Sequence, residues 1–368
     1  MKLYITCIYV SLSFFISCNG QINNKSQITK EGIPHLTIGD TVKNLSNSIW
    51  IIFQAQNGDY WFGSDTNGIF RFDGKTIVNF TERDGLSSNR IRNIQEDKHG
   101  NIYFSTLAGI DKFNGSSFTY LKPIKNMFPN SNWKLQSDDL WFSIIGKNGE
   151  KGPYRFDGEN LYQLEFPKHF MEDDYFKRFP NNAWSPYEVY FIYKDQKGNM
   201  WFGTSNFGLC RYDGYTLSWM YEDHLTNVPN GGSFGIRSII EDLHGSFWIC
   251  NSQHRYTMTP DFVEENGNRF IKYHKEKGID NLKSADGFNY IYFMSAVVDS
   301  SNNLWLATYD DGVWKYNGKS TTRYEVKEGP KDYTVFSIYK DKKGNLWLGT
   351  HAGGAFKFNG LSFERFKP

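Results

Sequence analysis

The chain has 368 residues, with 41 Lys and Arg against 40 Asp and Glu, so its formal net charge is +1. This balance gives no overall electric field that would attract nucleic acid or an acidic membrane, and the basic residues are scattered rather than clustered. Aromatic residues make up 18 % of the chain, a content that suits thin sheets packed face to face. We therefore expect no nucleic-acid partner and a core built from many rings.

Residues 1–18 have the pattern of a bacterial lipoprotein signal peptide. A charged start is followed by the apolar stretch Leu3–Ile16, which is too short to span a membrane as a helix. The stretch ends in Phe-Ile-Ser-Cys, which resembles the lipobox that precedes an acylated cysteine. We therefore predict lipidation of Cys18, a location in the bacterial cell envelope and a flexible polar tether over residues 19–32. The alternative is an ordinary signal peptide cleaved near Gly20.

From residue 33 to residue 368, an Asn-Gly or Asp-Gly pair recurs between short runs of aromatic and β-branched residues. The pairs are Asp73-Gly74, Asn114-Gly115, Asp157-Gly158, Asp213-Gly214, Asn266-Gly267, Asn317-Gly318 and Asn359-Gly360. Such pairs favour two-residue β-hairpin turns because they tolerate positive φ at both positions. Their glycines are 41, 43, 56, 53, 51 and 42 residues apart, a period typical of a repeated β-unit. We therefore predict an all-β fold over residues 33–368, a seven-bladed β-propeller of four-stranded antiparallel blades.

The last repeat shows the predicted blade most clearly. Its four strands are expected over residues 335–341, 346–350, 354–358 and 361–366. One large ring recurs on the second predicted strand of every repeat, at Trp61, Tyr103, Trp141, Trp201, Trp248, Trp305 and Trp347. A ring at one fixed position in each blade predicts packing between neighbouring sheets rather than a sugar-binding ladder.

Two further expectations concern the first blade and the cysteines. Residues 34–38 resemble an outer strand that precedes the strand Ile49–Phe53, and we expect them to pair at the seam between the first and last blades. Cys210 and Cys250 fall on predicted strands of neighbouring repeats. Buried free thiols are favoured over a disulfide there.

The repeat resembles a known family. The frame Ile-x-x-Asp-x-x-Gly-Asn-x-Trp-x-Gly-Thr, followed by a Gly-rich turn and Phe-x-Phe-Asp/Asn-Gly, is similar to the two-component regulator propeller repeat, and five of the seven repeats match it well. The resemblance implies a propeller of the kind that forms the periplasmic sensor half of hybrid histidine kinases, particularly those that respond to carbohydrates. Because no kinase or membrane-spanning segment follows the repeats in this chain, we expect a stand-alone lipoprotein form without a histidine kinase.

Long connections indicate which face of the propeller would carry a site. The loops between second and third strands and the crossovers between blades lie on the same face, and the long ones are residues 144–153, 166–186, 222–234, 251–261 and 274–289. Variable loops on a rigid scaffold commonly carry function. The candidate ligand-binding residues on this face mix rings with charged and amide groups, a combination that suits sugars or peptides. They are Asp65, Asn67, Arg90, Trp184, Tyr187, Arg237, His254, Arg255, Tyr256, Tyr309, Asp310 and His351.

Motifs of known catalytic or metal-binding sites are absent from the sequence. We therefore predict no catalytic residue, metal or cofactor. The preferred function is a lipid-anchored envelope propeller that binds a glycan, a peptide or an envelope protein without catalysis, touching the membrane through its anchor only. One alternative is a propeller enzyme of lyase or hydrolase type, in which His254 or His351 pairs with a carboxylate such as Asp310 or Glu188 at the channel mouth. A second alternative is a purely structural scaffold.

Overall fold

The computed structural model describes residues 27–28, 34–35, 38–127, 134–144, 151–222, 224–226, 234–280, 282–327, 329 and 332–368. The chain divides into two compact units, Met1–Thr37 and Ile38–Pro368. In the first unit, β1 (Gln27–Ile28) pairs antiparallel with β2 (Pro34–His35). The predicted signal peptide with Cys18 lies outside the described residues, as does most of the predicted tether. Within the described ranges no helix has the length and apolar character needed to cross a membrane.

The second unit is made of β-sheets, and towards its two ends four sheets each contain four antiparallel strands in chain order. The first sheet contains β4 (Ile49–Gln54), β5 (Tyr60–Ser64), β6 (Ile69–Phe72) and β7 (Ile77–Phe80), with β3 (Asp40–Val42) added beside β7. The second contains β8 (Ile91–Glu96), β9 (Ile102–Thr106), β10 (Ile110–Phe113) and β11 (Phe118–Leu121). The last two contain β24 (Phe293–Val298), β25 (Leu304–Thr308), β26 (Val313–Tyr316) and β27 (Thr321–Tyr324), then β28 (Val335–Lys340), β29 (Leu346–Thr350), β30 (Ala355–Phe358) and β31 (Phe363–Arg365). Short helical segments are η1 (Glu82–Asp84) and α1 (Glu172–Arg178).

The middle of the chain is less regular. Strands β16 (Val189–Lys194), β17 (Met200–Thr204), β18 (Leu209–Tyr212) and β19 (Leu217–Met220) share one sheet with β20 (Ile239–Glu241), β21 (Phe247–Ile249), β22 (Asn251–Glu265) and β23 (Asn268–Lys277), because β19 also pairs with β23. Before them, β13 (Leu140–Phe142), β14 (Tyr154–Phe156) and β15 (Leu161–Leu164) are antiparallel, while β12 (Pro123–Met127) runs parallel beside β15. Within the described ranges β13 is an edge strand of its sheet, and no further strand pairs with its free edge. The count of seven complete four-stranded blades therefore stays a prediction.

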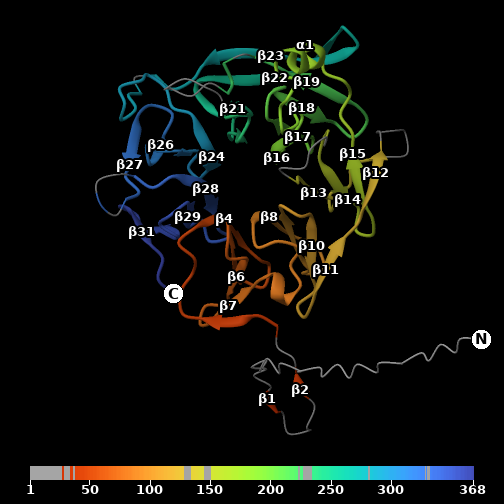
Figure 1. Cartoon of the computed structure of the whole chain (residues 1–368). Helices are drawn as coiled ribbons and strands as arrows, with labels where there is room; N and C mark the ends of the chain where they lie inside the picture. Colours follow the sequence, from red (N-terminus) through yellow and green to blue (C-terminus); the bar gives the residue numbers. More distant parts are fainter. Residues whose placement is uncertain are drawn as a thin grey trace, which may run out of the picture. The chain divides into compact units, whose positions relative to one another are not determined.

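The sheets of the second unit surround a common centre. Their first strands lie innermost (Figure 1), and β16, β20, β24, β28, β4 and β8 contact one another in this order. The contact between β28 and β4 brings the last sheet beside the first and closes the array. The predicted all-β propeller is confirmed. The strand pairing differs from the expectation that residues 34–38 pair at the seam between the first and last blades. Pro34–His35 pair with β1, and β3 is the strand that pairs with β7 of the first sheet.

Rings on the second strands pack each sheet against the next, as predicted. Trp61 lies 5.5 Å from Phe104 of the following sheet, measured between ring centroids. Trp347 of the last sheet lies 4.9 Å from Tyr60 of the first sheet, so the same contact closes the ring. The neighbouring glycine permits this approach: a Cβ at Gly349 would lie 2.7 Å from the Ile49 carbonyl oxygen. The Trp-x-Gly element of the repeat is therefore a packing device between blades.

The Asn-Gly and Asp-Gly turns differ from the expected geometry at six of the seven pairs. The glycine has positive φ throughout, but of the preceding residues only Asn266 does. In the other six the Asn or Asp side chain caps a four-residue connection; Asp73 Oδ1, for example, accepts hydrogen bonds from the amides of Lys75 and Thr76. The prediction of two-residue hairpins is therefore wrong except at Asn266-Gly267. The Asn or Asp side chain accepts hydrogen bonds from amides of its own turn, which favours the longer connection over a two-residue turn. The dipeptide alone does not show which of the two turns forms.

An aspartate precedes the first turn in several sheets and stabilises that turn. Asp341 Oδ1 accepts hydrogen bonds from the amides of Lys343 and Asn345, and its Oδ2 accepts from the Trp347 indole at 2.9 Å and the Tyr60 hydroxyl at 2.7 Å. Burial alone would raise the pKa of Asp341, but these hydrogen bonds outweigh it and lower the pKa to about 2. One carboxylate thus joins a turn of the last sheet to both its own tryptophan and the first sheet.

We expect Asp341→Asn to lower the free energy of unfolding by about 2 kcal/mol at pH 7, because a shift of about two pKa units in a buried carboxyl corresponds to about that energy. The folded-state pKa is depressed, so this stabilisation is present above the unfolded pKa of about 4 and is lost as the pH falls towards about 2. Urea unfolding between pH 7 and pH 2.5 measures the effect. The exposed Asp280→Asn is the control, and an equal loss in both variants would contradict the assignment.

Both cysteines of the propeller are free and buried, as predicted. Burial raises the pKa of the Cys250 thiol to about 11, so this group stays protonated and unreactive at neutral pH.

Candidate functional site

A cavity of about 540 Å³ lies where the innermost strands meet. Its walls come from β4, β8, β16, β24 and β28 and from connections between strands. The lining residues are Trp50, Ile51, Ile91, Arg92, Asn93, Ser143, Tyr190, Phe191, Ile192, Phe234, Arg237, Met294, Ser295, Tyr309, Phe336 and Ser337. A cavity of this size is in the range that holds a small ligand.

In five inner strands a β-bulge places one large side chain at the cavity. Register shifts in β4, β8, β16, β24 and β28 each leave one extra residue in the strand; these residues are Trp50, Arg92, Tyr190, Met294 and Phe336. All five line the cavity. Bulges commonly re-aim a side chain near a functional site. The repeated bulge therefore gives each of these five strands one variable, inward-directed position.

Four aromatic rings form a continuous belt along one side of the cavity. Trp50 is stacked on Phe336 with 4.0 Å between ring centroids, and Phe336 lies 6.5 Å from Tyr309. Tyr309 in turn lies 5.4 Å from Phe234. Tyr309 and Phe234 are 41 % and 37 % exposed, so their rings are accessible from solvent. We call Trp50, Phe336, Tyr309 and Phe234 the aromatic belt.

An arginine lies at each end of the aromatic belt. The Arg92 guanidinium lies 4.2 Å from the centroid of Trp50. Arg237 donates from Nε to the Phe234 carbonyl at 3.0 Å, and its guanidinium lies 3.8 Å from the centroid of Tyr190. Burial raises the pKa of Tyr190 to about 12 although Arg237 opposes this shift, so the Tyr190 hydroxyl keeps its proton. The cavity thus combines ring faces with two positive groups.

Asp65 anchors the first of these arginines. The Asp65 carboxylate is 8 % exposed and accepts from Arg92 Nη2 at 2.8 Å and from Arg90 Nη2 at 3.3 Å. Burial lowers the pKa of Arg92, and the carboxylate partly offsets this shift. Asp65 and Arg90 therefore support the cavity through Arg92 rather than lining it.

Only part of the predicted set of site residues converges on this cavity. Arg237 and Tyr309 line it. The His351 ring lies beside it, 6.1 Å from Trp50 and 6.0 Å from Phe336. The remaining predicted residues lie in the core or elsewhere on the surface.

Two predicted tyrosines are core residues and not surface ones. Tyr187 is fully buried, its hydroxyl donates to Glu172 and it accepts from the His169 amide at 2.7 Å. Tyr256 is 1 % exposed, and its hydroxyl lies 2.8 Å from Nε2 of His224. Both hydroxyls are used inside the protein, where burial requires a hydrogen-bond partner.

The predicted loop over residues 251–261 is wrong, because these residues belong to β22. Strands β22 and β23 form a long hairpin that turns at Asn266-Gly267. The insertion therefore satisfies its backbone by pairing with itself. His254 and Arg255 lie on this hairpin, where Arg255 pairs with Glu276 at 2.8 Å. The connection over residues 166–186 is also partly ordered, since it contains α1.

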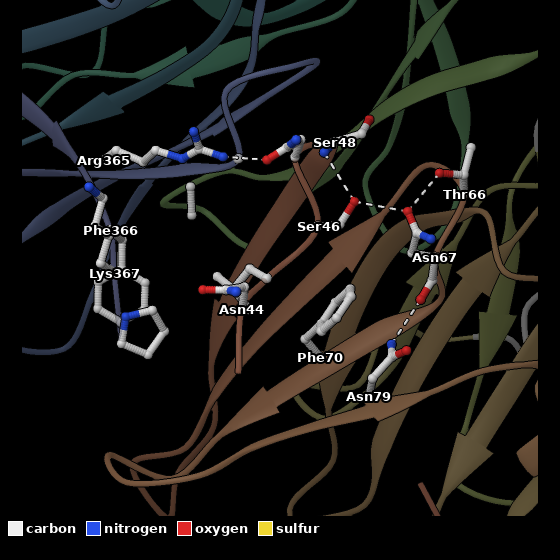
Figure 2. A pocket seen from close by; sticks show the side chains of 15 residues that line it. Asn44, Ser46, Ser48, Thr66, Asn67, Phe70, Asn79, Arg365, Phe366 and Lys367 are labelled. Carbon is white, nitrogen blue, oxygen red and sulfur yellow. Dashed lines mark hydrogen bonds between the residues drawn. The ribbon is translucent and has the colours of Figure 1, made fainter. Parts of the chain in front are cut away.

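The other predicted residues are dispersed. Trp184 is 56 % exposed, and Asp310 is also exposed. Asn67 lines a second groove of about 800 Å³ between the first and last sheets (Figure 2), where Ser46 Oγ donates to Asn67 Oδ1 at 3.0 Å. In the same groove Arg365 donates to Asn47 across the seam. This groove is part of the joint that closes the ring.

Sequence reasoning missed Trp50, Arg92, Tyr190 and Phe336, although a signal was present. The first strands share the pattern apolar, variable, any residue, apolar, as in Ile49-Trp-Ile-Ile52 and Ile91-Arg-Asn-Ile94. In-register comparison of the repeats aligns the variable position in six of them, at Trp50, Arg92, Tyr190, Arg237, Met294 and Phe336. The position stands out only when it is compared between repeats, because within one strand it looks like an ordinary exposed residue.

Comparison with known proteins agrees with this architecture. Residues 85–108, 184–206 and 329–352 match the family described as two component regulator propeller. Each matched segment contains a first strand, the aspartate of the following turn and a second strand. A search of curated proteins gives no match.

Solved structures show the same fold at low identity. Extracellular domains of two proteins described as hybrid two-component systems of B. thetaiotaomicron are each 19 % identical, with TM-scores of 0.54. They cover 89 % and 88 % of this chain, which spans only 40 % and 41 % of their length. Virginiamycin B lyase from Staphylococcus aureus is 14 % identical, with a TM-score of 0.57, and covers 86 % of this chain and 97 % of its own. Three segments of the chain therefore match the two-component regulator propeller family, and the solved structures share its fold at low identity.

Proposed function

We propose that this protein is a sensor-like binding module of the bacterial cell envelope that holds a small ligand in its central cavity without catalysis. The observation that carries the proposal is the repeated bulge, which directs one side chain from each of five inner strands into the same cavity. Varying these side chains changes the cavity while the packing between blades stays intact. A site of this kind suits recognition, because rings supply contact area and a few polar groups fix orientation.

The cellular setting belongs to the same proposal. The lipobox-like sequence ending at Cys18 favours an exported, lipid-anchored protein. A glycan, a peptide or an envelope protein remains the proposed partner. The fold shared with extracellular domains of hybrid two-component systems supports a sensor-like role.

A thermal-shift screen of the full chain in detergent, against oligosaccharides and short peptides, tests the proposal. A ligand at about 100 times its dissociation constant adds about 2.7 kcal/mol to the free energy of unfolding. We expect Tyr309→Ala to reduce the ligand-induced shift at least by half, because this exposed ring belongs to the aromatic belt. Tyr215→Ala, a 64 % exposed tyrosine in a turn between strands, is the matched control. Equal shifts in both variants would place the binding site outside the cavity.

Lyase-type catalysis is a second candidate because His254 of the hairpin is paired with His224 of the connection after β19. His254 and His224 lie 4.8 Å apart between ring centroids, and Glu222 lies 3.0 Å from Nε2 of His224. Burial, with smaller contributions from Lys275 and His224, lowers the pKa of His254, so this ring is neutral and able to accept a proton at pH 7. Catalysis predicts chemical conversion of a bound ligand that His254→Ala abolishes. An unchanged ligand after prolonged incubation would exclude it for that ligand.

A further inference from the structure

The polar groups that line the central cavity are unbalanced in charge. Among the lining residues that the structure describes there are two arginines, Arg92 and Arg237, and no aspartate or glutamate. Arg92 already shares Asp65 with Arg90. Arg237 forms no ion pair with a carboxylate among the described residues. Glu188 forms a side-chain hydrogen bond with Tyr190, the ring on which the Arg237 guanidinium lies.

The same cavity offers free hydrogen-bond donors through Arg237. Arg237 uses Nε for the Phe234 carbonyl, which leaves the two terminal nitrogens of its guanidinium. A buried donor without an acceptor is costly. Such a set of groups is satisfied by a ligand that brings acceptor oxygens.

We propose that the cavity binds a carboxylate carried on a ring with an apolar face, an inference that rests on the proposed binding function and specifies its ligand. The carboxylate accepts hydrogen bonds from the terminal nitrogens of Arg237, since a guanidinium stacked on a ring keeps its N–H edge available. The ring of the ligand lies against the aromatic belt.

Other ligand chemistries fit these groups less well. A cation would face Arg92 and Arg237 with no acidic residue among the described lining. A neutral sugar would satisfy the aromatic belt but would leave the charge of Arg237 uncompensated on desolvation. An acidic sugar and an aromatic carboxylate both provide the required chemistry, so the experiment includes one of each.

Isothermal titration calorimetry with matched probe pairs tests the proposal. The acidic probes are digalacturonate and indole-3-acetate, and their neutral counterparts are digalacturonate dimethyl ester and indole-3-acetamide. We expect at least one acid to bind about tenfold or more tightly than its neutral counterpart, and the preferred acid identifies the ring type. In Arg237→Gln that preference falls to less than threefold, whereas affinity for the neutral probe stays the same.

Two variants control for folding and net charge. Arg83→Gln removes the same charge from a side chain that is 79 % exposed and does not line the cavity, and it keeps the wild-type preference. Arg237→Lys retains the charge but loses the planar guanidinium, so we expect its preference for the acid to be intermediate. This variant tests the role of Arg237 if Arg237→Gln does not fold.

Three outcomes contradict the proposal in distinguishable ways. Equal affinity for acid and neutral probes, lost in Tyr309→Ala, overturns the acidic-ligand inference and leaves the proposed binding function standing. An acid preference that survives in Arg237→Gln places the anion elsewhere and also overturns the inference. Failure of all four probes to bind at 10 mM, together with no response in the thermal-shift screen, contradicts both the inference and the proposed function.

Discussion

Replacing Trp347 by alanine is expected to lower the free energy of unfolding by about 3–5 kcal/mol, the usual cost of removing a large buried ring. Trp347 is 2 % exposed and lies 4.9 Å from Tyr60 and 5.0 Å from Phe366 between ring centroids. Its indole also donates to Asp341, the carboxylate that holds the Tyr60 hydroxyl. The substitution therefore removes packing and a hydrogen bond at the contact that joins the last sheet to the first. Equilibrium unfolding in urea measures the change.

Two comparisons separate these contributions. Trp347→Phe keeps a ring and loses the donor, so an intermediate loss of stability is expected. Trp184→Ala, on a side chain that is 56 % exposed, is expected to change stability by less than about 0.5 kcal/mol. A loss below about 1 kcal/mol in Trp347→Ala would show that the ring closes without this contact.

Acid is expected to destabilise the protein by up to about 3 kcal/mol between pH 6.5 and pH 4 because of one buried histidine. His169 is fully buried between aromatic rings, 4.5 Å from Phe207 and 4.8 Å from Trp219, and its Nε2 has no hydrogen-bond partner in the described structure. Burial lowers the pKa of His169 to about 4. The unfolded chain, with a pKa near 6.5, binds this proton first, so stability is complete above pH 6.5 and is lost as the pH falls towards 4.

His169→Phe removes this titration while preserving the stacked ring. The variant loses the hydrogen bond from the Met171 amide to Nδ1, which is long at 3.3 Å. We expect its free energy of unfolding to change much less than that of the wild type between pH 6.5 and pH 4, measured by urea unfolding in half-unit steps. Identical slopes for the two proteins would contradict the assignment. The effect is separable from that of Asp341, which belongs to the range between about pH 4 and pH 2.

The repeat determined how much of the fold could be predicted. A ring such as Trp347 and an aspartate such as Asp341 recur at fixed spacing, and the hydrogen bond between them is repeated in several sheets, as by Asp195 and Trp201. Features that occur once were predicted less well. The strand character of β22 depends on pairing with β23 over a long hairpin, and a single run of residues does not show the length of such pairing.

The site was predicted only in part because its residues meet through ring closure. Arg237 and Tyr309 were identified from their places in variable connections. Trp50 and Phe336 belong to the first and last blades and stack at 4.0 Å only because β28 contacts β4. The faces of a strand are predicted from the alternation of its side chains, and the bulge at Trp50 and at Phe336 interrupts this alternation. A strict period of two therefore does not predict that these two side chains line the cavity.

The most direct measurement of the central claim is a crystal structure of the protein with the strongest ligand from the screen. The account predicts that the ligand lies in the central cavity, with its ring against Trp50 and Tyr309 and an oxygen within hydrogen-bond distance of Arg237. A ligand bound instead in the groove between the first and last sheets (Figure 2), with an empty central cavity, would contradict it.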